Sequence, residues 1–264
     1  MINRLLFKLV TIGAAIALLW FGLSQIDFMK AFKIDTSSGD TEKKLGELFW
    51  ETIERTETVI RNDSVNKAVA KLVDELAQAN DIDRNKIQLH IIQNDQANAF
   101  ALPGNHLVVY TGLINTCDKQ EELIGVLGHE IAHIEKRHVM KKLIKELGLS
   151  VLLSMAGGGG GSVSSEAVRT LSSSAYDRKL ETEADFMSVQ YMLKAEVNPA
   201  PFADLMYKMA TEHDLPAMVY WISTHPESEE RAKEIIGHIK NKKLPKKQVL
   251  SAAEWTSLKN KVDY

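Results

Sequence analysis

The pentapeptide His129-Glu130-Ile131-Ala132-His133 indicates the fold class of this 264-residue chain. On a helix, His129 and His133 lie one turn apart on the same face, so both imidazoles can reach one metal ion. Glu130 is displaced around the helix, where its carboxylate can reach a metal-bound water rather than the metal. Apolar residues recur around the pentapeptide at helical spacing, at Ile124, Leu127, Ile131 and Ile134. The stretch therefore predicts an amphipathic helix that supplies two ligands to a zinc site.

The alternative to a metal site is a surface helix with two solvated histidines. The setting favours the metal, because the pentapeptide lies within an amphipathic pattern and because Gly125 and Gly128 keep the helix thin on its approach to the site. The chain has one cysteine, Cys117, which excludes an intramolecular disulfide and a multi-cysteine zinc ribbon. A metal site in this chain must therefore use histidines and carboxylates.

Two histidines need a third protein ligand. The longer zinc motif with a further glycine and histidine is excluded, because those positions hold Lys136 and Val139. His138 follows His133 by five residues and would point about 140° around a continuous helix from it, so we expect a polar neighbour. The better candidate is Glu181, on a later predicted helix that is long enough to pack against the first.

Further polar residues accompany this candidate set. Asp185 lies one helical turn after Glu181 and could accept a proton from a ligand histidine, which would fix the tautomer of that ring. Glu183 lies on another face and fits solvent exposure; without the upstream motif, a solvated acidic face would explain all three carboxylates equally well. His225 directly precedes Pro226, near a predicted helix start. It is either a capping and packing residue or a group that faces the metal.

The rest of the chain predicts helices around a small sheet. Residues 41–80 have helical periodicity. Residues 87–92 alternate as a strand does, and 106–110 are rich in β-formers, with a turn signal at 102–105 between the two segments. These features predict an α+β fold that is mainly helical.

Several local signals predict where the later helices begin. Asp118 and Glu121 form a candidate capping box ahead of the zinc-site helix. The five glycines of 157–161 predict a flexible loop, and the next helix is expected from about Ser165 to Ala195. A last helix should begin near Pro226.

The N-terminus carries a targeting or anchoring signal. Residues 9–23 are almost wholly apolar and follow Arg4 and Lys8. They form either an uncleaved single-span anchor or a signal peptide that is removed. We favour the anchor, because Gly22 and Ser24 make a weak processing site. The positive residues would stay inside, which places the residues after about 30 outside the cytoplasm, on the periplasmic side in a bacterium. Cleavage would instead give a secreted or periplasmic protein.

The charge balance argues against one class of partner. The chain has 32 Lys and Arg and 35 Asp and Glu, a formal net charge of −3. Nucleic-acid binding usually shows as a basic patch, so we expect no nucleic-acid partner.

Four segments match one known family in the same order. Together they resemble the gluzincin zinc metalloproteases of the CAAX prenyl protease, HtpX and BepA (the M forty-eight peptidases), and are closest to single-domain BepA-like members. The segments are Asn98 to Gly104, His129 to His133, Tyr176 to Asp185, and Thr224-His225-Pro226 with Arg231. The resemblance covers about residues 45–240, most of the chain.

The resemblance implies a zincin-like fold and a zinc metalloendopeptidase with one Zn²⁺ per chain. It assigns His129, His133 and Glu181 as the zinc ligands and Glu130 as the general base. His225 becomes an active-site histidine that either stabilises the transition state or closes the metal site. By the same resemblance, Asp185 and Arg231 do not bind the metal but contact the ligand residues and hold them in position.

The resemblance also implies a polypeptide substrate, such as a misfolded or envelope protein. That substrate would lie extended along an edge strand formed by Asn98, Ala99, Phe100, Ala101 and Pro103. We expect residues 1–30 to be the anchor or signal segment and 31–264 to be one metalloprotease domain held at the membrane. The rival hypothesis is a non-catalytic, membrane-tethered zinc-binding chaperone or adaptor, in which His225 is a fourth ligand.

Overall fold

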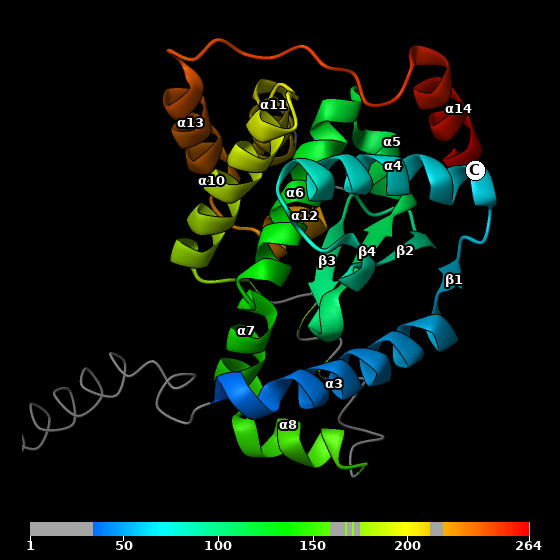
Figure 1. Ribbon diagram of the computed structural model, residues 1–264, viewed down its shortest axis with the longest axis vertical. Helices are drawn as coiled ribbons and strands as arrows, with labels where there is room; N and C mark the ends of the chain where they lie inside the picture. The colour runs from blue at the N-terminus through cyan, green and yellow to red at the C-terminus, as the bar shows by residue number, and fades with distance from the viewer. Residues whose placement is uncertain (1–33, 159–166, 168–170, 172–174, 212–218, 264) are drawn as a thin grey trace, which may run out of the picture. The chain divides into compact units, whose positions relative to one another are not determined.

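The computed structural model describes residues 34–158, 167, 171, 175–211 and 219–263 (Figure 1). The chain divides into two compact units, Met1–Thr41 and Glu42–Tyr264. The expected anchor at 1–30 lies outside the described residues, as do Gly159, Gly160 and Gly161 of the glycine loop. Among the helices that are described, none combines the length and apolar character needed to cross a bilayer.

A four-stranded mixed sheet forms in the order β1-β2-β4-β3. β2 pairs in parallel with β4, and the other two pairings are antiparallel. The strands span Thr58–Val59 (β1), Gln88–Gln93 (β2), Ala99–Leu102 (β3) and His106–Tyr110 (β4). Both strands expected from residue alternation are therefore confirmed, and β3 lies at an edge of the sheet.

The helical character expected over 41–80 is confirmed on both sides of a break, where a short strand separates two helices. α3 spans Ile34–Thr56 and α4 spans Asp63–Ala79. Between them β1 joins the sheet, and the backbone N–H of Ile60 donates to the carbonyl of Ile91 at 2.8 Å. Asn62 then caps α4, since its side chain accepts from the backbone of Ser64 at 3.0 Å. The helical periodicity continues on both sides of the break, which is why periodicity alone did not reveal it.

The remaining helices pack beside the sheet, with α6 running between β3 and the pair α10 and α11 (Figure 1). They are α5 Thr111–Thr116, α6 Gln120–Glu135, α7 His138–Leu147, α8 Leu149–Ala156, α10 Arg178–Lys194, α11 Ala200–Thr211, α12 Val219–Thr224, α13 Ser228–Ile239 and α14 Ala252–Val262. This mainly helical α+β fold is the class that the sequence predicts.

Two expected helix starts need correction. The capping box of α6 is shifted by one residue, with Lys119 at the N-cap and Glu122 as the acidic member: its carboxylate accepts the backbone N–H of Asp118 at 2.6 Å, and the helix begins at Gln120. The helix expected from about Ser165 to Ala195 is interrupted: Ala167 and Leu171 are helical, residues 175–177 are not, and α10 begins at Arg178. Here the backbone N–H of Tyr176 donates to the carbonyl at the end of α12, a tertiary contact that no local signal predicts. α13 begins at Ser228, two residues after Pro226.

The glycines of α6 set its distance from α10. A side chain at Gly128 would collide with Ser188 on α10, whose hydroxyl donates to the carbonyl of Gly125 at 2.6 Å. A side chain at Gly125 would overlap the ring of Phe202 on α11. The close approach expected from these glycines is confirmed, and it brings the helix of Glu181 against the helix of His129 and His133.

Candidate metal centre

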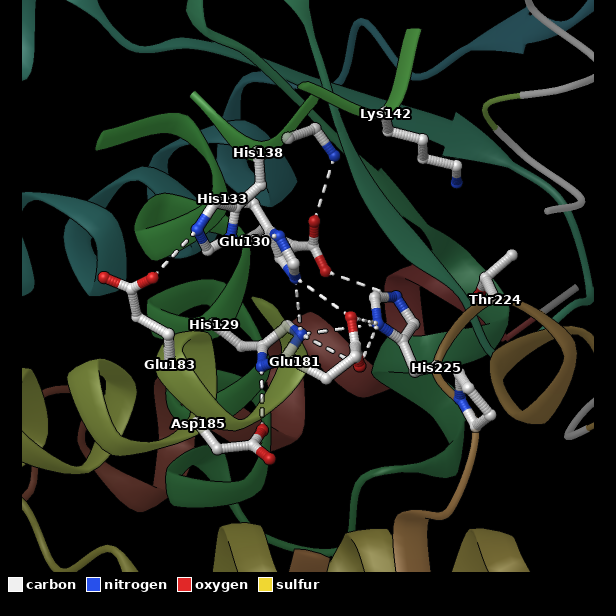
Figure 2. Close-up of polar contacts among 12 residues, drawn as sticks. His129, Glu130, His133, His138, Lys142, Glu181, Glu183, Asp185, Thr224 and His225 are labelled. Atoms are coloured by element: carbon white, nitrogen blue, oxygen red, sulfur yellow. Dashed lines mark hydrogen bonds and ion pairs between the residues drawn. The ribbon is translucent and has the colours of Figure 1, made fainter. Parts of the chain in front are cut away.

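Four side chains converge where α6, α10 and the end of α12 meet (Figure 2). His129 and His133 come from α6, Glu181 from the first turn of α10, and His225 from the residue after α12. One ligand atom from each lies within 4.8 Å of every other. All four side chains are buried. The three ligands expected from the sequence are therefore brought together, and His225 joins them.

The atoms that face one another are those that a transition metal binds. His129 Nε2 lies 2.9 Å from His133 Nε2 and 3.3 Å from His225 Nδ1. Glu181 Oε1 lies 3.3 Å from His133 Nε2, and Glu181 Oε2 lies 3.0 Å from His225 Nδ1. Imidazole nitrogens with one carboxylate are typical zinc ligands. This donor set, closed off from water, fits Zn²⁺.

Asp185 determines which ring nitrogen of His129 carries the proton. Its Oδ1 lies 2.9 Å from His129 Nδ1. Because a carboxylate only accepts, the neutral ring carries its proton on Nδ1, and Nε2 presents a bare lone pair to the centre. Burial acts to raise the pKa of Asp185, but Arg231 and His129 outweigh it and the pKa is lowered. Asp185 is therefore charged at neutral pH.

Arg231 joins the two carboxylates of α10. Its Nε and Nη2 donate to both oxygens of Asp185, at 2.6 and 2.7 Å. Its Nη1 also pairs with Glu181. Burial acts to raise the pKa of Glu181, yet His225 and Arg231 hold it well below its usual range. A buried guanidinium thus keeps Glu181 available as an anionic ligand.

Glu130 lies beside the centre and faces the sheet. Its Oε2 accepts the backbone N–H of Ala101 at 3.0 Å, and its Oε1 lies 3.5 Å from His225 Nε2 (Figure 2). Burial, and then the charge of Glu181, raises the pKa of Glu130 well above its usual range. A carboxylate with a raised pKa is a better proton acceptor than a solvated one.

His225 faces the centre with both ring nitrogens. Nδ1 lies against Glu181, and Nε2 points toward Glu130. The ring of Trp221 stacks on it with the ring centroids 4.1 Å apart. His225 therefore packs against Trp221 and also faces the centre, whereas Glu227 occupies the N-cap position of α13. The hydroxyl of Ser228, not His225, makes the side-chain contact at the start of α13, donating to the His225 carbonyl at 2.8 Å.

Comparison with known proteins agrees with this geometry. Residues 63–239 match the family described as Peptidase family M48. The chain belongs to this family. As a member of peptidase family M48, it is 31% identical over 154 residues to "Mitochondrial metalloendopeptidase OMA1" of Schizosaccharomyces pombe, which covers 57% of this chain and 46% of that protein.

Two bacterial relatives in family M48 are also similar. "Beta-barrel assembly-enhancing protease" of Yersinia pestis is 26% identical over 198 residues, covering 68% of this chain and 40% of that protein. "Metalloprotease LoiP" of Escherichia coli is 29% identical over 180 residues, covering 64% and 70%. The chain spans less than half the length of the OMA1 and Yersinia relatives.

The five residues predicted to bind substrate lie along β3 in this M48 chain. Ala99, Phe100 and Ala101 are in the strand, Asn98 precedes it and Pro103 follows it. All five are buried, and Ala101 donates its N–H to Glu130. The geometry thus places this strand next to the metal centre.

Two residues that sequence reasoning missed also lie against the M48 metal centre. The ring of Tyr176 stacks on His133, with the centroids 4.2 Å apart. Lys142 on α7 is buried with its Nζ 4.2 Å from the Tyr176 ring centroid, and it donates to the carbonyl of Leu171 at 3.1 Å. Burial lowers the pKa of Lys142 to about 8. A lysine in a lysine-rich helix carries no sequence signal of burial, so only the fold reveals it.

Proposed function

We propose that the chain is a zinc-dependent endopeptidase. His129, His133 and Glu181 hold one Zn²⁺, and Glu130 is the general base. The observation that carries the proposal is the position of Glu130: a buried carboxylate with a raised pKa borders the three ligand residues. A purely structural zinc site has no need of such a group. The names of the M48 relatives, which include metalloendopeptidase and protease, support the same function.

The chemistry is hydrolysis of a peptide bond. Bound zinc supplies a Lewis acid that lowers the pKa of a water and stabilises the oxyanion. Glu130 takes a proton from the water as its oxygen attacks the scissile carbonyl carbon. When the C–N bond breaks, Glu130 returns that proton to the leaving amine. Arg231 and Asp185 hold Glu181 and His129 in place. His225 either donates a hydrogen bond to the oxyanion or serves as a fourth ligand.

The substrate in this proposal is an extended polypeptide, such as a misfolded or envelope protein. It would pair with β3, the strand at the edge of the sheet. Residues 1–30 would tether the domain of 31–264 to a membrane with the catalytic site outside the cytoplasm, or would be removed as a signal peptide. The apolar character of residues 9–23 supports this part of the proposal.

Replacing the general base tests the mechanism. A purified Glu130→Gln protein should keep one zinc per chain, because Glu130 is not a ligand, and should cleave casein at least about 100-fold more slowly. Metal content and the cleavage rate are measured on the same preparation. Undiminished turnover by this variant would exclude Glu130 as the general base.

A second candidate is a non-catalytic zinc protein that acts as a chaperone or adaptor. It is favoured by the position of His225, because four protein ligands would close the site in the manner of a structural zinc. Cleavage of casein that stops with a chelator and returns with zinc would exclude this candidate. Loss of folding on chelation, without peptide cleavage under any condition, would favour it.

A further inference from the structure

His138 is a buried histidine that the proposed mechanism does not use. Its side chain is 0% exposed, and its Nδ1 lies 3.0 Å from Nδ1 of His133. The expectation of a polar neighbour is confirmed, but the expectation that it points about 140° away from His133 is wrong, because the helix is not continuous there.

A tight turn returns the ring of His138 to the active-site helix. α6 ends at Glu135, and α7 begins at His138. Between them Arg137 has a left-handed backbone, with φ of 54°. This conformation is strained for a residue with a side chain. Glu42 on α3 holds it, since Nε and Nη2 of Arg137 both donate to Glu42 Oε2, at 3.0 and 2.6 Å.

A carboxylate lies within ion-pair range of the other end of His138. Glu183 on α10 places Oε2 3.4 Å from His138 Nε2, and its Oε1 pairs with Lys136 at 3.0 Å. Figure 2 shows Glu183 on the α10 helix that also carries Glu181 and Asp185. Glu183 is half exposed, with 41% of its side chain accessible. Glu183 is thus exposed to solvent on one side, and on the other it is connected through the His138 ring to the candidate ligand His133.

The positions of the protons follow from this order. A neutral imidazole carries one N–H, and a carboxylate only accepts. The carboxylate of Glu183, 3.4 Å away, favours the proton of His138 on Nε2, which leaves Nδ1 as an acceptor. Facing that acceptor, His133 carries its proton on Nδ1. The Nε2 lone pair of His133 is then directed at His129 Nε2 and Glu181, where a metal would bind.

We propose that His138 and Glu183 are positioning residues that hold His133 in the Nδ1–H tautomer and so prepare its Nε2 for zinc. They do for His133 what Asp185 does for His129, but through an added imidazole. The inference rests on the proposed function only in taking His133 as a metal ligand. A role in packing alone would need an aromatic ring at 138, not a nitrogen aimed at His133.

The test compares four variants of the full chain with the wild type. His138→Phe keeps a ring but removes the acceptor, and His138→Gln offers a carbonyl oxygen in its place. Glu183→Ala removes the outer carboxylate. Glu135→Gln is the matched control, because it removes an exposed charge from α6 itself. Zinc affinity is measured by competition with a chelator, and the His133 tautomer is read from ¹⁵N shifts of the metal-free protein.

We expect His138→Phe to weaken zinc binding about 10- to 100-fold, which is typical when the outer partner of a ligand histidine is lost. His138→Gln should recover most of that loss, and Glu183→Ala should weaken binding less than His138→Phe does. Both damaging variants should populate the Nε2–H tautomer of His133, and Glu135→Gln should match the wild type. Zinc affinity and tautomer unchanged in His138→Phe and Glu183→Ala would overturn the proposal. If His138→Phe does not fold, the surface variant Glu183→Ala decides alone by the same two readouts.

A fifth variant separates this inference from the proposed function. His133→Ala should abolish tight zinc binding if His133 is a ligand. Zinc binding that survives His133→Ala would overturn the ligand assignment itself. Zinc binding lost in His133→Ala but untouched in His138→Phe would leave the endopeptidase proposal standing and remove the positioning pair.

Discussion

The histidine pair of the metal centre and the histidine pair of the sheet look alike at first. His129 and His133 on α6 have ring nitrogens 2.9 Å apart, and so do His90 on β2 and His106 on β4. In both pairs burial lowers the pKa of each ring. The distance between ring nitrogens therefore does not distinguish a metal site from a structural contact.

The surroundings of the two pairs differ. On the sheet, Gln88 Nε2 lies 3.0 Å from His106 Nε2, and Trp50 of α3 stacks on His90 with the centroids 3.6 Å apart. One chain of hydrogen bonds there satisfies the nitrogens that face each other. In the metal centre, the carboxylates of Asp185 and Glu181 lie beside the rings. Asp185 contacts the ring nitrogen of His129 that points away from the centre, so the lone pair of the other nitrogen points toward the metal position. Carboxylates placed to orient the rings are what mark a metal site.

The largest expected difference between the pairs is in metal content. His133→Ala should lose tight zinc binding and reduce casein cleavage by at least about 1,000-fold, because both metal and activated water are lost. His90→Gln should keep one zinc per chain and near wild-type cleavage. Elemental analysis and rate measurements check both. Zinc loss in His90→Gln would show that the sheet pair also supports the metal centre.

The next largest effect concerns the buried cation of the metal centre. Arg231→Met should lower the free energy of unfolding by about 3–5 kcal/mol, since it leaves the buried carboxylate of Asp185 without its guanidinium. Denaturant unfolding of the zinc-loaded protein measures the change. A loss below about 1 kcal/mol would mean that zinc and His129 suffice to hold the two carboxylates.

The histidine pair of the sheet, His90 and His106, should make the free energy of unfolding depend on pH. Burial lowers the pKa of His90 to about 3 and that of His106 to about 4. Both would titrate near about 6.5 in the unfolded chain, which therefore binds more protons in acid. The stability from this pair is complete above about pH 6.5 and falls as the pH drops toward about 4.

Unfolding midpoints at saturating zinc, measured from pH 7 to pH 5, check the pH effect. His90→Gln should give a shallower decline than the wild type, because one of the two depressed groups is gone. Identical slopes for both proteins would place the acid sensitivity elsewhere.

The smallest expected effect is at the outer end of the sheet contact. Gln88→Ala removes an exposed side chain that donates to the carbonyl of Gly104 at 3.2 Å and touches His106. We expect a loss of about 1 kcal/mol or less in unfolding free energy, the usual contribution of a hydrogen bond near the surface. Thermal unfolding measures it. A loss above about 3 kcal/mol would mean that the sheet pair supports far more of the fold than its contacts indicate.

The centre of the site could be predicted from sequence, because its chemistry follows from helix geometry. His129, Glu130 and His133 lie within two turns of one helix, so their relative positions follow from the rise and twist of α6. Glu181 was a candidate from its place on a later helix, but its assignment as a ligand came from the resemblance, since its distance from α6 depends on how two helices pack. The strands β2 and β4 were predictable because residue alternation and β-forming composition are local signals.

The remaining features depend on contacts between distant residues. The direction of His138 follows from the left-handed backbone of Arg137, which Glu42 stabilises from far along the chain. The late start of α10 follows from a backbone hydrogen bond between Tyr176 and Thr224. The burial of Lys142 follows from the ring of Tyr176. No window of local sequence contains both partners of any of these contacts.

The close contact of Gly128 with Ser188 has a consequence for reading divergent relatives. Neither residue reaches the metal centre, yet together they set how near α10 comes to α6. A homologue could keep every ligand and still lose zinc if a bulky side chain at either position pushed the two helices apart. Small residues at positions 128 and 188 should therefore change together in evolution.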